Sequence, residues 1–476
     1  MKQFPYAMYH GNLRLRHAGR FRRKEDPARL EKRQTLCQRG SLCTIDAMKT
    51  NRVLSNAVWM IGCRVVESVL HLVIIMLTSR YLGPANYGII NYAASLVAFV
   101  LPLMQLGIRN IMIKEMVDAP EQRGAILGTG LCMNLISSVL CVIGVTAFAL
   151  VANPGEPQTV IVCLLYSTCL LFEAVQILKY WFQEKLMGKY ISLSMLAAYV
   201  LVTAYQLVIL VNDCNVLWFA FTDSVKHLFI AVFLVLLYRH FRADELRLSW
   251  TVCKRLLASG RYYILSNMMV TVFAQTDKIM LKQMMGDAAT GYYAAAVNCT
   301  TLTSFLFIAI LDSVRPGVFQ SRRVDYKDYE KRVTQLYAVI AAVAVLQCVG
   351  VTIFAPLVVR ILYGMDYAPT IPLLQMVIWY TVFAYLGQVR DIWMLAEEKQ
   401  SLLWKLNLFG ALANVALNLA LIPGMGAAGA AVASLASQFI ANVGVCIMIP
   451  SIRRSGVLMA RGCHPKVFMG MLRGLK

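Results

Sequence analysis

Length, composition and charge exclude several classes of protein at once. The chain has 476 residues, of which 59% are apolar and only 15% are charged, whereas a soluble domain is usually about a quarter charged. The net charge is nevertheless +21, a combination typical of a polytopic membrane protein with basic loops on one side and not of a nucleic-acid-binding protein. The 13 cysteines form no CxxC pair, and most lie in apolar runs, so neither a zinc site nor a secreted disulfide scaffold is indicated.

Residues 1–52 differ from the rest of the chain. They contain 13 Lys or Arg and four Asp or Glu, and they have no long apolar run, which excludes a secretory signal peptide. We interpret them as a disordered, irregular basic arm on the cytoplasmic side, within reach of anionic lipid. The stretch Met48–Arg52, directly before the first apolar run, is equally typical of a natural start. Residues 1–47 are therefore either part of this arm or an upstream extension without a role.

Apolar stretches recur from Ala57 onward, and each is close to the roughly 20 residues that cross a hydrocarbon core of about 30 Å. We interpret them as helices, because a helix satisfies every backbone polar group within its own segment. The sequence therefore predicts an all-α polytopic membrane protein with twelve transmembrane helices. Their predicted ranges are 56–79, 87–106, 125–151, 159–178, 191–210, 216–238, 263–284, 291–311, 335–357, 371–389, 402–422 and 427–449.

The distribution of Lys and Arg predicts how these helices are oriented. With the N-terminus in the cytoplasm, and with Lys282 and Lys405 counted with the loops next to their span ends, the cytoplasmic segments hold 40 of the 46 cations, the outer loops hold three, and three lie within spans. Positive loops stay on the cytoplasmic side, so both termini are predicted to be cytoplasmic. The outer loops are short, and no Walker A, HExxH or GxSxG motif occurs. The sequence therefore favours a transporter over an enzyme, with no cofactor and no metal site.

The two halves of the span pattern look related. Gly83–Gly88 after the first span and Gly286–Gly291 after the seventh both read G-x4-G, 203 residues apart, at the same point of a six-helix unit. Because six spans is an even number, such a repeat is parallel, with a pseudo-two-fold axis along the membrane normal. The alternative is a chance recurrence of glycine turns. The predicted domains are a basic arm (1–52), an N-terminal six-helix bundle (53–238), a cytoplasmic linker (239–261), a C-terminal six-helix bundle (262–450) and a basic cytoplasmic tail (451–476).

Ionisable residues inside predicted spans are candidates for a substrate or ion path, because a charge within a membrane is costly. In the first span, Arg64, Glu67 and His71 share one helical face, and in the sixth, Asp223, Lys226 and His227 do the same. Arg64 and Lys226 are candidate cations for a phosphate group. Glu67, His71 and Asp223 are candidate counter-ions or ion-coupling groups. The alternative is that Arg64–Glu67 and Asp223–Lys226 are buried pairs that only order the bundle.

Three further spans carry isolated polar groups. Asp277 and Lys278 are adjacent in the seventh span, so we expect only one of them to face inward and choose Asp277 as a further coupling group. Glu173 in the fourth span has no evident partner and is expected to be neutral and hydrogen-bonded. Amides at helical spacing in the eleventh span fit contacts to sugar hydroxyls, or else hydrogen bonds between helices. They are Asn407, Asn414 and Asn418.

Three stretches of the sequence resemble the polysaccharide transporter family of lipid-linked oligosaccharide flippases, which shares a superfamily with the multidrug and toxin extruders. They are Ser79–Gly83 through Tyr87-Gly88, Asp277–Leu281 through Gly291–Ala295, and Leu421–Pro423 through Gly426–Ala431. Together with the hydropathy profile, the likeness covers about residues 50–450. The basic arm at 1–47 departs from the family pattern.

The resemblance implies two bundles around a central cavity and alternating access. It also implies a flippase that carries a polyprenyl-diphosphate-linked oligosaccharide, for O-antigen, capsule or exopolysaccharide, across a bacterial inner membrane. The partners it implies are this substrate, membrane lipid and other membrane proteins of polysaccharide assembly, with no nucleic acid. The rival is a cation-coupled multidrug antiporter of the same superfamily, whose cationic substrates favour an acidic cavity, whereas the mid-span charges here are mixed. A membrane-embedded polysaccharide polymerase is disfavoured by the short outer loops.

Overall fold

The computed structural model describes residues 27–185, 187–241 and 244–464, which are almost entirely helical and include no strand. Contacts divide the chain into two compact units, residues 1–57 and 58–476. In the first unit, α1 begins at Pro27, so the part of the predicted arm that is described is helical and not irregular. The reason is its content of Leu, Glu, Lys, Arg and Gln, which are good helix formers, behind a proline in the first turn.

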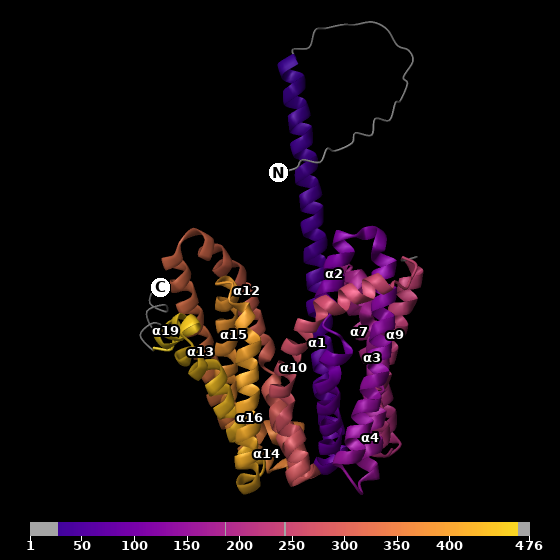
Figure 1. The fold of residues 1–476 in the computed structure, drawn as a ribbon, viewed down its shortest axis with the longest axis vertical. Helices are drawn as coiled ribbons and strands as arrows, with labels where there is room; N and C mark the ends of the chain where they lie inside the picture. Colours follow the sequence, from indigo (N-terminus) through magenta and orange to yellow (C-terminus); the bar gives the residue numbers. More distant parts are fainter. Residues whose placement is uncertain (1–26, 186, 242–243, 465–476) are drawn as a thin grey trace. The chain divides into compact units, whose positions relative to one another are not determined.

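The helices of the second unit follow the order of the predicted spans (Figure 1). The first half of the chain forms α1 (Pro27–Met104), α2 (Arg109–Asp118), α3 (Arg123–Ala152), α4 (Pro157–Ser167), α5 (Cys169–Val175), α6 (Lys179–Glu184), α7 (Gly188–Val211), α8 (Val216–Ala220) and α9 (Thr222–His240). The second half forms α10 (Trp250–Met285), α11 (Asp287–Thr301), α12 (Ser304–Val324), α13 (Tyr326–Leu362), α14 (Thr370–Val377), α15 (Tyr380–Ala396), α16 (Leu403–Met425), α17 (Ala427–Phe439), α18 (Val445–Met448) and α19 (Arg453–Gly462).

Ten helical stretches of the described residues are long and apolar enough to cross a membrane. The first of them, Val66–Asp118, contains two predicted spans, because the helix continues through a kink at Gly83. The predicted seventh span lies in α10, where Asp277 and Lys278 interrupt the apolar sequence and lower the mean hydropathy. When the first stretch is counted as two spans and α10 is added, the described helices correspond to the twelve predicted spans, and the all-α fold class is confirmed. The predicted domain limits stay a prediction.

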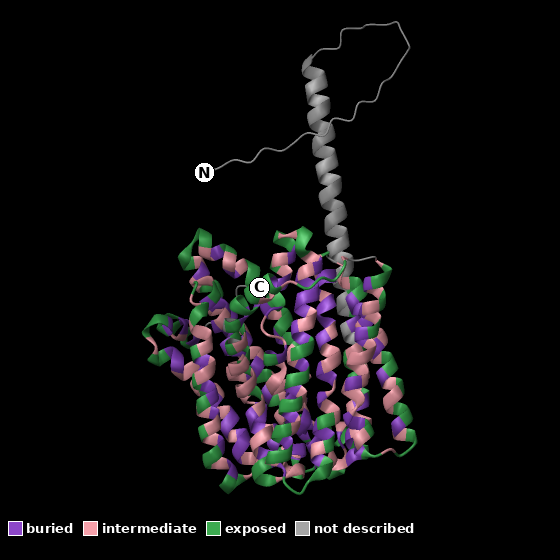
Figure 2. Ribbon diagram, turned by 45° about the vertical axis from the view of Figure 1, so that its right-hand side comes forward, coloured by how far each residue is buried: buried purple, intermediate pink, exposed green. Residues whose placement is uncertain are grey.

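Figure 2 shows exposed positions, in green, along the helices of the second unit, and many of the exposed residues have large apolar side chains. Leu140 and Ile143 on α3 are 63% and 60% exposed, and Leu346 and Ile353 on α13 are 73% and 66% exposed. A protein in water rarely leaves so much contiguous apolar surface uncovered. These faces are therefore suited to contact with lipid chains, while aromatic and small residues fill the interior of each half.

The turns at one end of the second unit repeat between the two halves. Three backbone positions with positive φ recur in order, and their offsets of 203, 209 and 213 residues match the predicted repeat. The pairs are Gly83 (φ 68°) with Gly286 (φ 84°), Gly155 (φ 85°) with Gly364 (φ 90°), and Asp213 (φ 49°) with Gly426 (φ 58°). Glycine tolerates this left-handed region, and aspartate is among the few other residues that visit it. We call this end of the second unit the turn end, and the opposite end, with residues 244–250, the linker end.

The structure explains why the second residue conserved between the two G-x4-G stretches is a glycine in each case: there is no room for a side chain. A Cβ atom on Gly88 would overlap the carbonyl oxygen of Asp287, and one on Gly291 would overlap the carbonyl oxygen of Pro84. The two glycines thus let α1 and α11 cross backbone to backbone at the turn end, in a reciprocal contact expected of a two-fold axis. The repeat seen in the sequence is therefore also the point at which the halves touch.

Polar contacts reinforce the crossing between the halves. The Arg80 guanidinium donates to the carbonyl oxygens of Arg360 and Ile361, at 3.1 and 2.5 Å. Three further hydrogen bonds join the halves. The hydroxyl of Tyr367 donates to the carbonyl of Ser79. The side-chain amides of Asn298 and Gln283 donate to the hydroxyls of Tyr87 and Tyr92, respectively.

Candidate functional site

Two of the predicted polar helix faces meet in one cavity of the N-terminal half. The cavity has a volume of about 140 Å³, with walls from α1, α4, α7 and α9. Asp223 and Lys226 on α9 form an ion pair, and Asp223 also accepts a hydrogen bond from the hydroxyl of Tyr166. His71 borders the same cavity, and its Nδ1 lies 2.7 Å from the hydroxyl of Tyr199. The structure therefore brings together three residues that lie in spans one and six.

The local sequence explains why the ion pair forms at this depth. Because α8 ends at Ala220 and α9 begins at Thr222, Asp223 lies in the first turn of α9, where peptide N–H groups favour a negative charge. Lys226, one turn further on, reaches back to the same carboxylate. The side chains of Lys226 and Asp223 keep 27% and 26% of their surface exposed, so a ligand in the cavity can reach both partners.

The remaining candidates of the first span are only partly described. Glu67 lies on α1, close enough to act electrostatically on the Tyr199 hydroxyl. The side chain of Arg64 lies outside the described residues. The roles predicted for Arg64 and Glu67 therefore stay predictions.

A larger cavity of about 370 Å³ lies in the C-terminal half, between α10, α11, α15 and α17. Lys278, Gln275, Asn298 and Gln438 give it a polar lining. Asp277 also borders it, although only 6% of this residue is exposed. Adjacent residues of a helix are about 100° apart, so Asp277 and Lys278 can occupy two flanks of one cavity, where we expected only one of them.

Asp277 is surrounded by hydrogen-bond donors from three other helices. Its Oδ1 accepts from the amides of Asn414 and Asn418 on α16, at 2.9 and 2.6 Å. Its Oδ2 accepts from the hydroxyl of Tyr293 on α11, at 2.6 Å, and from the hydroxyl of Ser434 on α17. Both carboxylate oxygens are thus satisfied by neutral groups, which is how a buried charge is made tolerable without a cation.

The three predicted sugar contacts therefore separate into two kinds. Asn414 and Asn418 form the hydrogen bonds between helices that were the alternative to sugar contacts, because their amides are directed at Asp277. Asn407 is half-buried on the same helix, nearer the linker end. Its role toward a sugar stays a prediction.

The sequence reading missed a second polar cluster in the N-terminal half. Glu173 on α5 is not isolated, because its Oε2 lies 2.9 Å from Nδ1 of His227 and its Oε1 lies 3.6 Å from Nζ of Lys179. Gln176 also contacts His227. The spacing of Glu173, Gln176 and Lys179, three residues apart each time, was a signal for a shared polar helix face. The partner on α9, His227, was expected only on the face of Asp223 and Lys226, and nothing in the sequence connected it to Glu173.

A buried arginine of the C-terminal half was also missed, because the predicted tenth span ended at residue 389. Arg390 on α15 is only 3% exposed. Its Nη1 donates to the carbonyl of Ala441 at 2.8 Å, and its Nη2 donates to Asp391 at 2.8 Å. Residues Ile440–Gly444 form a π-helical turn, which disturbs the regular backbone hydrogen bonding next to the Ala441 carbonyl. Arg390 therefore stabilises an irregular stretch of the last span.

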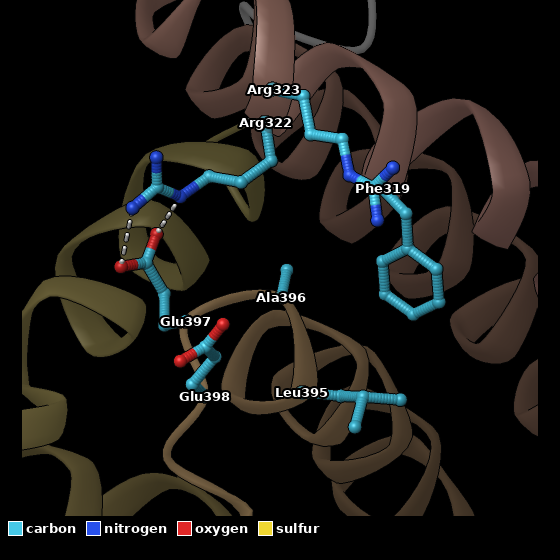
Figure 3. A pocket seen from close by; sticks show the side chains of 7 residues that line it. All are labelled: Phe319, Arg322, Arg323, Leu395, Ala396, Glu397 and Glu398. Carbon is cyan, nitrogen blue, oxygen red and sulfur yellow. Dashed lines mark hydrogen bonds and ion pairs between the residues drawn. The ribbon is translucent and has the colours of Figure 1, made fainter. Parts of the chain in front are cut away.

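A third cavity, of about 740 Å³, lies at the linker end of α12 and α15 (Figure 3). Figure 3 shows the guanidinium of Arg322 facing the carboxylate of Glu397, to which it donates two hydrogen bonds of 3.0 and 3.5 Å, while Arg323 extends away toward Phe319. Glu398 completes a lining with two cations and two anions. Its charges balance, and none of the predicted site residues borders it.

The turn end holds a buried cation between the two halves. Nζ of Lys282 lies 2.5 Å from Oε2 of Glu156 and 2.6 Å from Oδ1 of Asp287, and the lysine side chain is only 2% exposed. The hydrogen bond from Lys282 lowers the pKa of the Glu156 carboxyl, with a further contribution from the hydroxyl of Thr159. Since Glu156 precedes α4 and Lys282 lies in the last turn of α10, this cluster joins the two halves.

The comparison with known families decides what kind of chain carries these cavities. A family model described as polysaccharide biosynthesis protein matches residues 53–321, more than half of the chain. The chain belongs to the polysaccharide biosynthesis protein family. The match includes the Asp223–Lys226 pair, Asp277 and both G-x4-G stretches. No curated protein matches the chain.

Solved structures with the same fold are distant in sequence from this family member. The lipid II flippase MurJ in an inward closed conformation has a TM-score of 0.67 at 12% identity, covering 87% of this chain and 93% of MurJ. An inward-facing multidrug resistance MATE family transporter of the MOP superfamily has a TM-score of 0.62 at 15% identity, covering 83% and 96%. The MATE multidrug transporter DinF-BH has a TM-score of 0.57 at 14% identity, covering 86% and 96%. At such identities the likeness establishes the twelve-helix fold alone.

Proposed function

We propose that this protein is a flippase for a polyprenyl-diphosphate-linked oligosaccharide, the building unit of an O-antigen, capsule or exopolysaccharide. The observation that carries the proposal is membership of the polysaccharide biosynthesis protein family by a chain with a twelve-helix transporter fold. The structural similarity to a lipid II flippase supports a lipid-linked substrate. Alternating access of the two halves then moves the substrate from the cytoplasmic to the outer leaflet of a bacterial inner membrane.

The diphosphate of this substrate needs cations within the membrane. Lys226 borders the N-terminal cavity and Lys278 the C-terminal cavity, so each half contributes one. Arg64, at the predicted position on α1, is the third candidate. Because Asp223 already pairs with Lys226, an incoming phosphate competes with that carboxylate for the same ammonium group. Asp223 is therefore the proposed counter-ion, which is released when the substrate binds.

Coupling to an ion is assigned to the remaining acidic and imidazole groups. Asp277 is the proposed coupling carboxylate of the C-terminal half, with Asn414 and Asn418 holding it in position. Glu67 and His71 are proposed for the N-terminal half. Asn407 remains the proposed sugar contact of α16.

The proposed orientation places the turn end outside and the linker end, with both chain termini, in the cytoplasm. The support is the distribution of cations, because the segments predicted to be cytoplasmic hold 40 of the 46. Other membrane proteins of polysaccharide assembly are the proposed partners there.

A cation-coupled multidrug antiporter is the second candidate. The observation that favours it is the likeness in fold to MATE transporters, together with a carboxylate inside the spans of each half, Asp223 and Asp277. Each cavity, however, also contains a lysine, which opposes the binding of a cationic drug.

Transport in vesicles distinguishes the two candidates. The purified protein is reconstituted and offered either a short-chain polyprenyl-diphosphate disaccharide with a fluorescent label or a cationic rhodamine dye. We expect the wild-type protein to move the labelled lipid between leaflets. Lys226→Ala and Lys278→Ala should each lose most of this lipid movement. Lys405→Ala, a control at an exposed position, should keep it. The double variant Asp223→Asn/Lys226→Gln, which removes both charges of the pair, guards against a folding defect. Dye transport without lipid movement would reject the flippase and favour the antiporter.

A further inference from the structure

The fourth span is broken at the level of the missed polar cluster. α5 ends at Val175 and α6 begins at Lys179, and residues Gln176–Leu178 between them form a 3₁₀ turn. A 3₁₀ turn inside a longer helix often marks a hinge. Opposite this turn lies His227 on α9, whose ring nitrogen contacts Glu173, just before the turn, and Gln176, the first residue of the turn.

Nδ1 of His227 has two partners with opposite chemical demands. Oε2 of Glu173 lies 2.9 Å from it and can only accept a hydrogen bond, because it belongs to a carboxylate. Nε2 of Gln176 lies 2.6 Å from it and can only donate. A ring nitrogen donates when it carries a proton and accepts when it does not. Nδ1 therefore has a suitable partner in either state, but it can satisfy only one of the two at a time.

The groups around His227 can accommodate its imidazole with or without a proton on Nδ1. Glu173 keeps a second cation, because Nζ of Lys179 lies 3.6 Å from Oε1. The side chains of Glu173, Lys179 and His227 are 14%, 16% and 23% exposed, so the cluster is largely buried but still reachable by water. Other charged or titratable groups lie close to it on α2, α5, α6 and α9. Cys169 and Tyr180 lie near Glu173, Asp223 lies near His227, and Arg109 and Lys226 are the cations next to these groups.

We propose that Glu173, Gln176 and His227 form a proton-binding site that controls the 3₁₀ turn of the fourth span. With a proton on Nδ1, the imidazole donates to Glu173 and leaves the amide of Gln176 without its acceptor, so the turn is less restrained. Without that proton, the imidazole accepts from Gln176 and holds the turn against α9. Imidazole is the side chain that changes charge most readily between pH 5 and 8. The site needs no substrate, so it stands or falls separately from the proposed flippase activity.

Hydrogen–deuterium exchange of the purified full-length protein tests this site directly. The amides of residues 176–185 are followed from pH 5 to 8, after correction for the intrinsic pH dependence of exchange. In the wild type we expect several-fold faster exchange at the acidic end, with one midpoint inside this range. The same curve is expected for His240→Gln, a matched control at the end of α9. His227→Gln is expected to give exchange that does not vary with pH.

Two further variants separate a proton site from a purely structural contact. Gln176→Leu removes the partner of the unprotonated ring, so the midpoint moves to higher pH. Glu173→Gln removes the acceptor for the protonated ring, so the midpoint moves to lower pH. Each shift is expected to be roughly 0.5–1 pH unit, the size of one net hydrogen bond. If Glu173→Gln does not fold, the direction of the Gln176→Leu shift decides alone.

The proposal is overturned by either of two results. One is a wild-type exchange curve for residues 176–185 that is flat from pH 5 to 8. The other is a pH dependence that persists unchanged in His227→Gln.

Discussion

Two carboxylates inside the spans, Asp223 and Asp277, are stabilised in different ways. Asp223 has a cation within reach, Lys226, and a single hydroxyl donor, Tyr166. Asp277 has no cation among its hydrogen-bond partners in the described part of the chain and instead accepts from two amides and two hydroxyls. The first arrangement can exchange partners when an anion arrives, whereas the second depends on four side chains that all need an acceptor. Their responses to substitution are therefore expected to differ.

Asp277→Asn is expected to destabilise the protein. The substituted amide keeps one acceptor oxygen where the carboxylate has two, so the groups that donate to the lost oxygen no longer have their acceptor. Each donor left unsatisfied in a buried site costs about 1–3 kcal/mol. We expect a clearly lower midpoint of thermal unfolding in detergent.

The matched control for this substitution is Asp213→Asn. Asp213 is exposed and has a positive φ, which asparagine also adopts. Its unfolding midpoint should equal that of the wild type. An Asp277→Asn protein as stable as this control would contradict the four-donor arrangement.

Acidification is expected to weaken the Lys282 cluster through Glu156. The pKa of Glu156 is lowered in the folded protein by the hydrogen bond from Lys282. A group with a lowered pKa contributes stability that is complete above its ordinary pKa and is lost as the pH falls through the lowered value. Thermal unfolding between pH 6 and 3 should therefore show an acid-side loss that is smaller in Glu156→Gln. Because nearly half of the Glu156 side chain is exposed, we expect less than about 1 kcal/mol.

The control for the acid titration is Glu245→Gln. Glu245 pairs with Arg247 on the surface, and both side chains are mostly exposed. This variant should follow the wild-type curve. Equal acid-side losses in Glu156→Gln and the wild type would show that the cluster contributes nothing measurable.

At the scale of helices, the crossing of α1 and α11 depends on the absence of a side chain. Gly88→Ala and Gly291→Ala each place a Cβ against a backbone carbonyl of the other half, which cannot rotate away. Such overpacking typically costs about 1–3 kcal/mol. We expect both variants to unfold at lower temperature, and the double variant to cost less than the sum because both act on one contact.

Gly144→Ala is the control for the crossing, because Gly144 lies on the lipid-facing side of α3 with open space around it. Alanine is the better helix former by roughly 0.5–1 kcal/mol, so this variant should be as stable as the wild type or more so. Destabilisation of all three variants alike would mean that the glycines act through helix flexibility and not through the crossing.

The features that were predicted correctly from the sequence are those that depend on residues close together in the chain. Apolar length defines the spans, and the i, i+3 spacing of Asp223 and Lys226 put both on one face of α9, where the structure pairs them. The donors around Asp277 come from α11, α16 and α17, and Asn414 is 137 residues away in the chain. No spacing rule connects residues so far apart. The same holds for Glu173 and His227, which were read as separate groups on different spans although they form one cluster.

Irregular backbone was the second kind of feature that the sequence did not reveal. The 3₁₀ turn at Gln176–Leu178 and the π-helical turn at Ile440–Gly444 lie inside runs with ordinary helical composition. What distinguishes them is a polar group on a neighbouring helix, His227 in one case and Arg390 in the other. Each irregular turn therefore depends on a contact between helices, which a local sequence pattern does not reveal.

For the whole molecule, the strongest inference from sequence alone is its orientation in the membrane. Reversing it would require about 40 cations to cross the bilayer instead of three, which is opposed by the strong bias of membrane insertion for positive cytoplasmic loops. We therefore expect alkaline phosphatase inserted after Gly155 or Gly364, both at the turn end, to be active in cells. The same reporter inserted after Asp325, between α12 and α13, should be inactive, and green fluorescent protein fused behind Lys476 should fluoresce. Phosphatase activity at Asp325 would place the linker end outside, and the two lysines proposed for the diphosphate would then have to be reached from the opposite leaflet.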